Sequence, residues 1–469
     1  MLRNQPILHL ARVTVEAASP LSIATGRGAA LFDVQLATCA NGLPTIPGTS
    51  LAGVLRHALH GQSNEDTANK IFGFAQGNNG APSAFSVTWG HIHDSQDTPV
   101  DGLDLNRSWA EDTLLKPFAR AALPHRDHVR LGHFGSAAER GKFDRCFVPA
   151  GHRFSFEMSL SAGMDNPLTE QWDMLLALLN STGFRLGGST RRGYGQLKLV
   201  RMAAKTFNLI DRTNFDAYCK HPRRLDLPHA LGNTPVPPPS GLDWLNYELA
   251  LTPEDSWRFG GGKWALTPGK TADALPYTEE RLEWNQGQAQ TRRVIVVPAS
   301  GIKGALAHRL AYHYNRLSGH FADNAQTDYD PFKPEENPAV KVLFGYAKVQ
   351  REGQSDAGQV GAVLIEDAVL PLDEPKKIRL AHNSIDRYTG GVRNGVLFTE
   401  EALLGGAFTL KLAVKSSVWT QTDENIRQAF RDALEDLAKG RLALGAASAK
   451  GHGVFVGTVE HSDLRETVQ

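Results

Sequence analysis

The sequence predicts an α+β fold that is built twice, as two copies of one β-α-β-β-α-β-like unit with long inserted loops. The first observation is a repeated corner, in which an apolar strand ends at a proline and a turn of small residues leads into a helix. This corner occurs at Ile46–Arg56 (IPGTSLAGVLR) and again at Val297–Gly304 (VPASGIKG). The second observation is a glycine-rich loop near the end of each half, at Leu186–Gly195 (LGGSTRRGYG) and Leu444–Gly453 (LGAASAKGHG).

The third observation is the order of the other landmarks, which is the same in both halves. Matching segments lie roughly 240 to 280 positions apart. The pairs are the first strands Leu8–Val15 and Tyr247–Leu251, the small-residue turns Ser22–Gly28 and Arg258–Gly262, the segments Ile71–Ala75 and Leu343–Ala347, the strands Ala84–Thr88 and Ala362–Ile365, the polar segments Arg130–Lys142 and Asp386–Gly395, the strands Phe154–Leu160 and Phe408–Val414, and the helices Gln171–Leu179 and Ile426–Leu437. Chance could supply one such pair but hardly the ordered series, so we interpret the halves as copies of one domain.

The repeat also predicts the domain boundaries. We expect a first domain over residues 1–210 and a second over residues 243–460. Residues 211–242 include TPVPPPSG, and because proline favours an extended, semi-rigid chain we predict a linker there. Residues 461–469 are predicted to form a polar tail.

The composition limits the class of function. The chain of 469 residues carries 50 Lys and Arg against 50 Asp and Glu, so its formal net charge is zero. This balance argues against a protein that coats DNA through excess positive charge, but it allows a locally basic groove. The 3 cysteines have no CxxC spacing, which indicates neither a disulfide framework nor a zinc site. The sequence shows no signal-like start and no apolar run near about 18 residues, so we expect a cytoplasmic protein.

The two corners are candidate phosphate sites, because the first turn of a helix leaves backbone N–H groups unpaired. The hydroxyl groups of Thr49, Ser50 and Ser300 and the ammonium group of Lys303 lie at these helix starts. Lys303 is the strongest candidate of the four, since the first copy has Ala52 at the same step.

Further candidates lie on the helices that follow the corners. Arg56 and the two equivalent histidines, His57 and His308, are expected on the first helical turns. They would then lie close to a ligand at the corner. For the two histidines, a buried position in the core is the alternative interpretation.

The loops carry the remaining cations. Arg191, Arg192 and Lys450 lie among glycines that allow the backbone to approach a ligand closely, although the spacing is not that of a P-loop. A tight turn with solvated arginines is the alternative for these loops. Arg387 and Arg393 lie in a polar segment and either contact phosphate or remain exposed.

Taken together, the string IPGTSLAGVLR, the Phe-Gly and Phe-Gly-Tyr segments and LGGSTRRGYG resemble the RAMP superfamily of CRISPR proteins. The DRYTGG stretch at Asp386–Gly391 resembles the repeated backbone subunit of type III effector complexes. The resemblance covers residues 5–200 and 243–458. It implies an RRM-like (ferredoxin-like) core in each half. It also implies that corner and loop hold the guide RNA backbone, and that a thumb-like hairpin splays the guide–target duplex.

The resemblance further implies an aspartate that cuts the target RNA on the loop before the corner. Asp33 occupies this place in the first half, and a turn-capping role is the alternative. In the second half Asp273 is nearest to the expected place, but its longer spacing to Pro298 puts a second cutting site in doubt. Cleavage with Mg²⁺ or another divalent metal is the expectation that the resemblance supplies.

Three hypotheses for the function follow. The first is a fused double backbone subunit of a type III complex that acts as an endoribonuclease. Its expected partners are guide CRISPR RNA, single-stranded target RNA and other type III subunits, and no membrane. The second is a scaffold of the same fold that binds guide RNA without cutting. The third is a guide-processing endoribonuclease that uses a histidine and no metal, for which His57 is the candidate.

Overall fold

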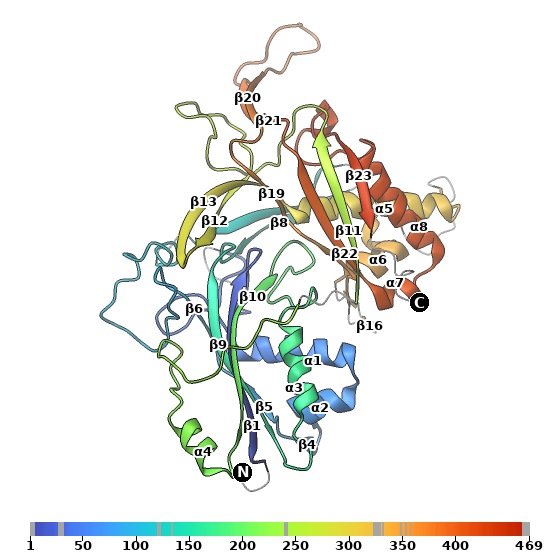
Figure 1. Cartoon of the computed structure of the whole chain (residues 1–469). Coiled ribbons are helices and arrows are strands. Elements are labelled where there is room, and N and C mark those ends of the chain that lie inside the picture. Colours follow the sequence, from blue (N-terminus) through green and yellow to red (C-terminus); the bar gives the residue numbers. More distant parts are fainter. Residues whose placement is uncertain are drawn as a thin grey trace.

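The computed structural model describes residues 5–26, 32–119, 123–132, 135–238, 243–321, 330, 333–347, 349–351, 354–356 and 358–461. The chain forms two lobes, one from the residues before the linker and one from the residues after it (Figure 1). We call these lobes the first half and the second half.

The first half is built on an antiparallel sheet with three helices against one face. The elements of this core are β1 (Ile7–Ala17), α1 (Gly48–Gln62), α2 (Glu65–Phe72), β5 (Phe85–Val87), β9 (Arg153–Ala162), α3 (Thr169–Leu178) and β10 (Leu197–Asn208). The order across the sheet is β10-β1-β9-β5, with β1 and β9 in the centre. This connectivity is β-α-β-β-α-β with an additional short helix.

The second half repeats this arrangement. Its core elements are β11 (Trp244–Pro253), α5 (Ala299–Leu317), α6 (Pro338–Phe344), β18 (Val363–Ile365), β22 (Phe408–Lys415), α7 (Ser416–Gln421), α8 (Glu424–Ala438) and β23 (Phe455–His461). The sheet order is β23-β11-β22-β18, which matches β10-β1-β9-β5 strand for strand. The chain therefore has two tandem ferredoxin-like domains, as the repeat predicted.

Each core follows from the alternation of side chains along its central strands. In the first half Val13 of β1 lies opposite Phe156 of β9, and both are fully buried against α1. In the second half Leu249 lies opposite Leu410 in the equivalent position, again fully buried. Apolar residues on one face of each strand thus meet the apolar stripe of a helix, and the other face of each sheet is free for other contacts.

A long hairpin precedes the third core strand of each half. β7 (His125–Leu131) pairs with β8 (Ala137–Cys146) in the first half, and β20 (Lys376–His382) pairs with β21 (Phe398–Leu404) in the second. The second hairpin projects from the end of the molecule at the top of Figure 1. These are the thumb-like hairpins that the sequence predicted.

The remaining strands are short or lie at the edges of the two cores. They are β2 (Thr45–Ile46), β3 (Phe74–Gln76), β4 (Asn79–Ala81), β6 (Gly90–Ile92), β12 (Thr278–Asn285), β13 (Gln288–Val297), β14 (Gly345–Tyr346), β15 (Val349–Arg351), β16 (Gln354–Asp356), β17 (Gln359–Val360) and β19 (Ala368–Pro371), with single 3-10 turns at Pro334–Glu336 and Ser448–Lys450. Strands β12, β13 and β19 form a sheet of their own.

The predicted linker is more structured than an extended chain. It begins with α4 (Arg212–Cys219), whose first turn is capped by the carboxylate of Asp211. The chain then covers part of the face of the first sheet that the helices leave free and pairs with the edge strand β10, where Thr234 donates its backbone N–H to Met202. Arg12 of β1 holds the same segment by donating to the carbonyl of Pro222 at 2.7 Å. Residues 239–242 of the predicted linker lie outside the described residues.

The two halves pack against each other through buried polar contacts. The guanidinium group of Arg126 in β7 donates to both Glu279 and Asp367 of the second half, and all three side chains are at most 7% exposed. Burial alone would lower the pKa of Arg126, but the two carboxylates raise it well above its usual value, so the side chain stays charged. Nearby, the guanidinium group of Arg153 lies 4.0 Å from the ring of Trp284 in β12.

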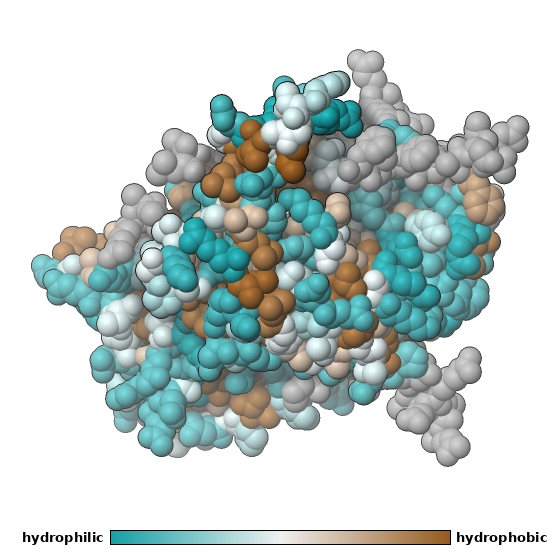
Figure 2. Space-filling model, turned by 90° about the horizontal axis from the view of Figure 1, so that it is seen from above, coloured by the Kyte–Doolittle hydropathy of each residue, from teal (hydrophilic) through white to brown (hydrophobic). Residues whose placement is uncertain are grey.

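The surface gives two further facts. Among the described residues, no helix is long and apolar enough to cross a membrane. On the hairpin end of the molecule, apolar side chains form small patches that hydrophilic residues separate (Figure 2).

Candidate functional site

Asp33 lies beside the second strand of the first hairpin. Its carboxylate accepts the backbone N–H of Asp144 at 3.0 Å, and the carboxylate of Asp144 accepts the N–H of Asp33 at 2.8 Å. Phe32 packs its ring 5.1 Å from that of His125 at the start of β7. These contacts hold an exposed aspartate at the base of the hairpin.

Asp273 occupies the equivalent place in the second half. Its N–H donates to the carbonyl of Thr399 in β21, and its carboxylate accepts the N–H of Thr399 at 2.7 Å and the hydroxyl at 3.1 Å. The backbone hydrogen bond from Thr399 lowers the pKa of Asp273. The longer spacing to Pro298 is explained by the hairpin β12–β13, which is inserted between Asp273 and the corner. The structure therefore brings Asp273 to the place of Asp33 despite the unequal spacing.

The two hairpins share a further feature, a histidine stacked on a phenylalanine. His128 in β7 stacks on Phe143 in β8 at 5.0 Å, and His382 in β20 stacks on Phe398 in β21 at 4.8 Å. Each phenylalanine immediately precedes the residue that pairs with the aspartate. Sequence reasoning missed these four residues, because each pair comes from two strands separated by loops of different length.

The two sites differ in the residue that lies opposite the aspartate. The first half has Asp144 opposite Asp33, whereas the second half has Thr399 opposite Asp273. Within the described ranges, no group of three or more His, Cys, Asp or Glu side chains is placed to hold a metal ion. One or two carboxylates do not complete the coordination of a divalent cation, which also takes oxygen ligands from water or phosphate.

Each glycine-rich loop returns to the stacked histidine or phenylalanine of its own hairpin. The tyrosine of the first loop, Tyr194, lies with its hydroxyl 3.2 Å from Nε2 of His128, and in the second loop the ammonium of Lys450 lies 5.3 Å from the ring of Phe398. Lys450 corresponds to Arg192 in the repeat, and both are exposed. Gly187 has φ +84°, and a Cβ there would lie 2.3 Å from the carbonyl of Ser22, so the turn requires glycine.

Positive charge is crowded where the first loop meets the second half. Burial, together with the charges of Arg192 and Arg191, lowers the pKa of Lys303 to about 8. Burial also lowers the pKa of Arg145 in β8, and Arg192 adds to this effect. Nε of Arg145 has no hydrogen-bond partner in the part of the chain that the structure describes. Cations that lie close enough to lower one another's pKa, with Nε of Arg145 unpaired among the described residues, favour the binding of a phosphate.

The two corners are not equivalent. Thr49 is exposed at the start of α1, and Ser50 beside it is half-buried. Pro47 precedes α1 and provides no side-chain cap. At the start of α5, by contrast, the N–H of Ala299 donates to the carboxylate of Asp367 at 2.8 Å. A carboxylate of this chain thus already occupies the helix start where the sequence predicted a phosphate, next to Ser300, which is half-buried.

Two of the predicted cations make internal contacts. Arg56 donates to the carbonyl of Gly73 at 2.7 Å, and so ties α1 to the end of α2. Arg191 donates to the carbonyl of Gly361 at 2.8 Å, and so ties the first loop to the second half. Burial lowers the pKa of Arg191 to about 10.

The other candidates are distributed over separate surfaces. His57 is exposed on α1, and His308 is half-buried on α5. Arg387 is exposed in the loop that joins β20 to β21. Lys303 donates to the carbonyl of Phe344 at 2.9 Å, and it lies close enough to Arg192 for that charge to lower its pKa.

Paired ferredoxin-like domains with a basic junction define a class of RNA-binding proteins. The model of the RAMP superfamily matches residues 14–198 and 251–456, which is well over half of the chain. The protein therefore belongs to the RAMP superfamily of CRISPR-associated RNA-binding subunits, which includes some ribonucleases. This membership implies CRISPR RNA and other CRISPR subunits as partners. A comparison with curated proteins gave no match.

Proposed function

We propose that the chain is a backbone subunit of a type III CRISPR RNA-guided complex, which binds guide RNA with both halves and cleaves the paired target RNA. The observation that carries the proposal is the matched position of Asp33 and Asp273, each paired with the second strand of its hairpin. Asp386–Gly391 adds the resemblance to that subunit. A site repeated at the same place in a repeated fold suits a ligand with a regular repeat, such as an RNA duplex.

The guide backbone would follow the basic junction and the open corner. A phosphate between Arg192 and Lys303 would relieve the repulsion that lowers the pKa of Lys303. At the first corner, the start of α1 and the exposed hydroxyl of Thr49 supply further donors. Contacts of this kind read the shape and charge of RNA, and base pairing reads its sequence. Because base pairing supplies the specificity, the protein needs only local cations, which agrees with its net charge of zero.

Cleavage would take place at the carboxylate of Asp33, where the residues present fit a divalent cation such as Mg²⁺. Within the described ranges, Asp33 Oδ1 and Asp144 Oδ2 accept no hydrogen bond. Mg²⁺ is commonly held by one or two carboxylates together with water and phosphate oxygens. When bound, the cation would stabilise negative charge on the phosphodiester. The reciprocal hydrogen bonds of Asp33 and Asp144 hold both carboxylates in position before RNA binds.

The second half favours binding over cutting. Thr399 replaces the second carboxylate, and it also donates two hydrogen bonds to one oxygen of Asp273. Asp273 is therefore left to act without an acidic neighbour in the place of Asp144. This difference supports the scaffold alternative for the second half and cleavage for the first.

The proposal is tested with assembled complex and a guide-matched RNA in Mg²⁺. We expect Asp33→Asn to abolish one cut and to leave guide binding unchanged, and Asp273→Asn to remove only a weaker second cut. Glu139→Gln is the matched control, because Glu139 is an exposed acid on the same strand β8. Cuts that all persist in the Asp33→Asn, Asp273→Asn double variant would refute the assignment. Cleavage of precursor guide RNA in EDTA that is lost in His57→Ala would instead identify a guide-processing enzyme.

A further inference from the structure

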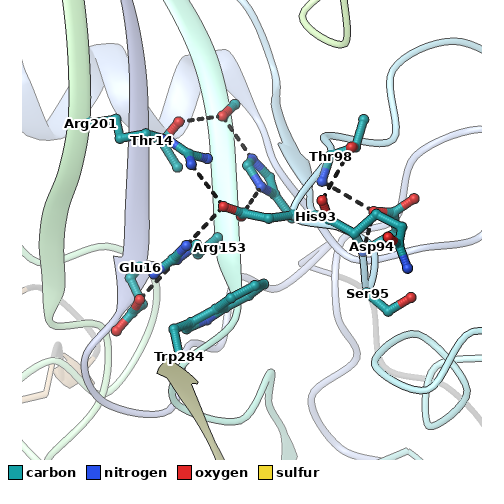
Figure 3. Close-up of polar contacts among 12 residues, drawn as sticks. Thr14, Glu16, His93, Asp94, Ser95, Thr98, Arg153, Arg201 and Trp284 are labelled. Carbon is teal, nitrogen blue, oxygen red and sulfur yellow. Dashed lines mark hydrogen bonds and ion pairs between the residues drawn. The ribbon is translucent and has the colours of Figure 1, made fainter. Parts of the chain in front are cut away.

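A second polar site lies on the face of the first sheet that the helices leave free, with Arg153 and Trp284 of β12 beside it (Figure 3). Thr14 of β1 and Ser155 of β9 are register partners on this face, and their hydroxyl oxygens lie 2.7 Å apart. His93 follows the end of β6, and its Nε2 lies 2.8 Å from the hydroxyl oxygen of Ser155. Its Nδ1 lies 2.8 Å from Oδ1 of Asp97. A serine, a histidine and an aspartate therefore form a continuous hydrogen-bonded chain.

The charges around this chain fix the direction of its hydrogen bonds. Burial alone would raise the pKa of Asp97, but hydrogen bonds from His93 and Arg201 lower it to about 2, so Asp97 is ionised. Burial lowers the pKa of His93, so its ring is neutral at pH 7. Ionised Asp97 can only accept, so Nδ1 of His93 carries the proton and donates. Nε2 of His93 must then accept the hydroxyl proton of Ser155. This is the tautomer that a general base next to a serine nucleophile requires.

A cavity of about 380 Å³ lies directly against these residues. Thr14, Ser155 and His93 line it on the side of the sheet, and Leu225 and Val236 line it on the side of the linker that crosses the sheet. Val236 is 40% exposed and the side chain of Arg201 is 53% exposed, and both line the cavity, so it opens to solvent on their side. Its volume is at the lower end of the range for small-molecule sites.

The ion pairs around the cavity indicate an uncharged ligand. Arg12 lies 3.2 Å from Glu157, and Arg153 lies 3.0 Å from Glu16. Arg153 and Arg201 both donate to Asp97, at 2.9 and 2.8 Å. Each carboxylate is thus matched by an arginine, and the cavity walls also carry the apolar side chains of Leu225 and Val236.

The fold itself does not require this chain of residues. In the second half the register partners at the positions of Thr14 and Ser155 are Ala250 and Thr409, and both are exposed. That free face carries instead an exposed ion pair between Glu248 and Lys411. Only the first half buries a serine against a histidine here, so the arrangement calls for an explanation other than the stability of a ferredoxin-like sheet.

We propose that Ser155 is a nucleophile toward small uncharged carboxylic esters, with His93 as its general base and Asp97 as the residue that positions His93. The hydroxyl oxygen of Ser155 bonds to the ester carbonyl carbon while its proton passes to Nε2 of His93. The bond from that carbon to the alcohol oxygen breaks, and His93 returns the proton to the departing alkoxide. Water then attacks the acyl-serine, giving its proton to His93, and Ser155 leaves with that proton as the acid is released. The guanidinium groups of Arg12 and Arg201 also line the cavity and are the cations available to the developing oxyanion.

The proposal is tested on the full chain with diisopropyl fluorophosphate, which phosphorylates activated serines with loss of fluoride. We expect one adduct, mapped to Ser155 by peptide mass spectrometry and absent in Ser155→Ala. In His93→Gln the rate of labelling should fall by about 10²–10⁴-fold, the usual contribution of a general base. Release of nitrophenolate from p-nitrophenyl acetate should fall in parallel.

Two further variants keep the test decisive. Ser159→Ala is the matched control, since Ser159 lies on the same strand β9 and outside the hydrogen-bonded chain, and it should label as the unaltered protein does. Ser161→Ala, on the same strand and also outside the hydrogen-bonded chain, is a second control and should label in the same way. The proposal is overturned if the folded protein is not labelled, if the label persists in Ser155→Ala, or if ester cleavage does not depend on Ser155.

Discussion

Arg126 of the first hairpin and Asp367 of the second half form an ion pair of 2.7 Å that is nearly inaccessible to solvent. Asp367 at the same time accepts the first N–H of α5. One buried contact therefore joins the two domains and closes the second corner with a carboxylate. The two halves have the same fold, but they are not interchangeable.

This ion pair predicts a large loss of stability when Arg126 is removed. Arg126→Met leaves Glu279 and Asp367 buried without a cation, and the usual cost of such a change is about 3–5 kcal/mol. We expect a marked drop in the midpoint of urea unfolding, followed by fluorescence. Arg130→Met on the same strand is the control, because its ion pair with Glu335 is exposed and 3.9 Å long. A similar effect of both substitutions would contradict the predicted role of burial.

Buried His152 predicts a dependence of stability on pH. Burial lowers the pKa of His152 to about 3, against 6.5 when the chain is unfolded. Between these values the unfolded chain binds a proton that the folded chain does not, so stability falls as the pH is lowered from 6.5 toward 3. His152→Phe should flatten this part of a plot of melting temperature against pH. His60→Gln on the exposed face of α1 should leave the slope unchanged, and an unchanged slope in His152→Phe would show that other groups are responsible.

The residues that pair with Asp33 and Asp273 predict that an acid in this position speeds cleavage. Asp144→Asn should slow the cut that depends on Asp33 by about 10–100-fold, the typical effect of a residue that orients a metal-binding carboxylate. Thr399→Asp should speed the cut that depends on Asp273, since it places an acid where the first half has Asp144. Single-turnover cleavage of a guide-matched RNA measures both rates. Equal guide binding in all variants serves as the control, and a faster cut in Asp144→Asn is the result that would rule out this role.

The exposed loop cations predict a change in salt dependence. Arg192→Ala and Lys450→Ala should each weaken guide RNA binding by a similar factor for every guide sequence, because phosphate contacts carry no sequence information. Each should also reduce the slope of log K against log salt by about 0.7–1. Arg212→Ala is the control, since its side chain is 84% exposed on α4, the helix at the bottom of Figure 1. An unchanged slope in Arg192→Ala and Lys450→Ala would place the RNA elsewhere.

Much of the fold was predictable because its signals are local. The alternation around Val13 and Leu249, the prolines before both corners and the glycines of both loops each act within a few residues. Their repeated order was enough to predict two copies of one domain. The site was only partly predictable. The resemblance was enough to name Asp33 as a site residue, whereas His128 and Phe143 meet only when the hairpin forms.

The linker shows where local signals are incomplete. Proline predicted an extended chain over residues 211–242, but Asp211 caps a helix, and the following residues pack on the first sheet. That packing, with Arg12 holding Pro222, forms one wall of the cavity next to Ser155. No short pattern in the linker specifies the surface that it covers.

The sequence by itself determined that this protein has two RAMP domains, with an aspartate, a corner and a glycine-rich loop in each. Only the tertiary structure decided which of these residues meet. It placed Asp367 at the start of α5, whereas the start of α1 has no side-chain cap. The physical reason is distance along the chain. Asp33 and Asp144 are 111 residues apart, and Arg126 and Asp367 are 241 apart. Contacts between such residues depend on how whole sheets and hairpins pack, which no local run of side chains encodes.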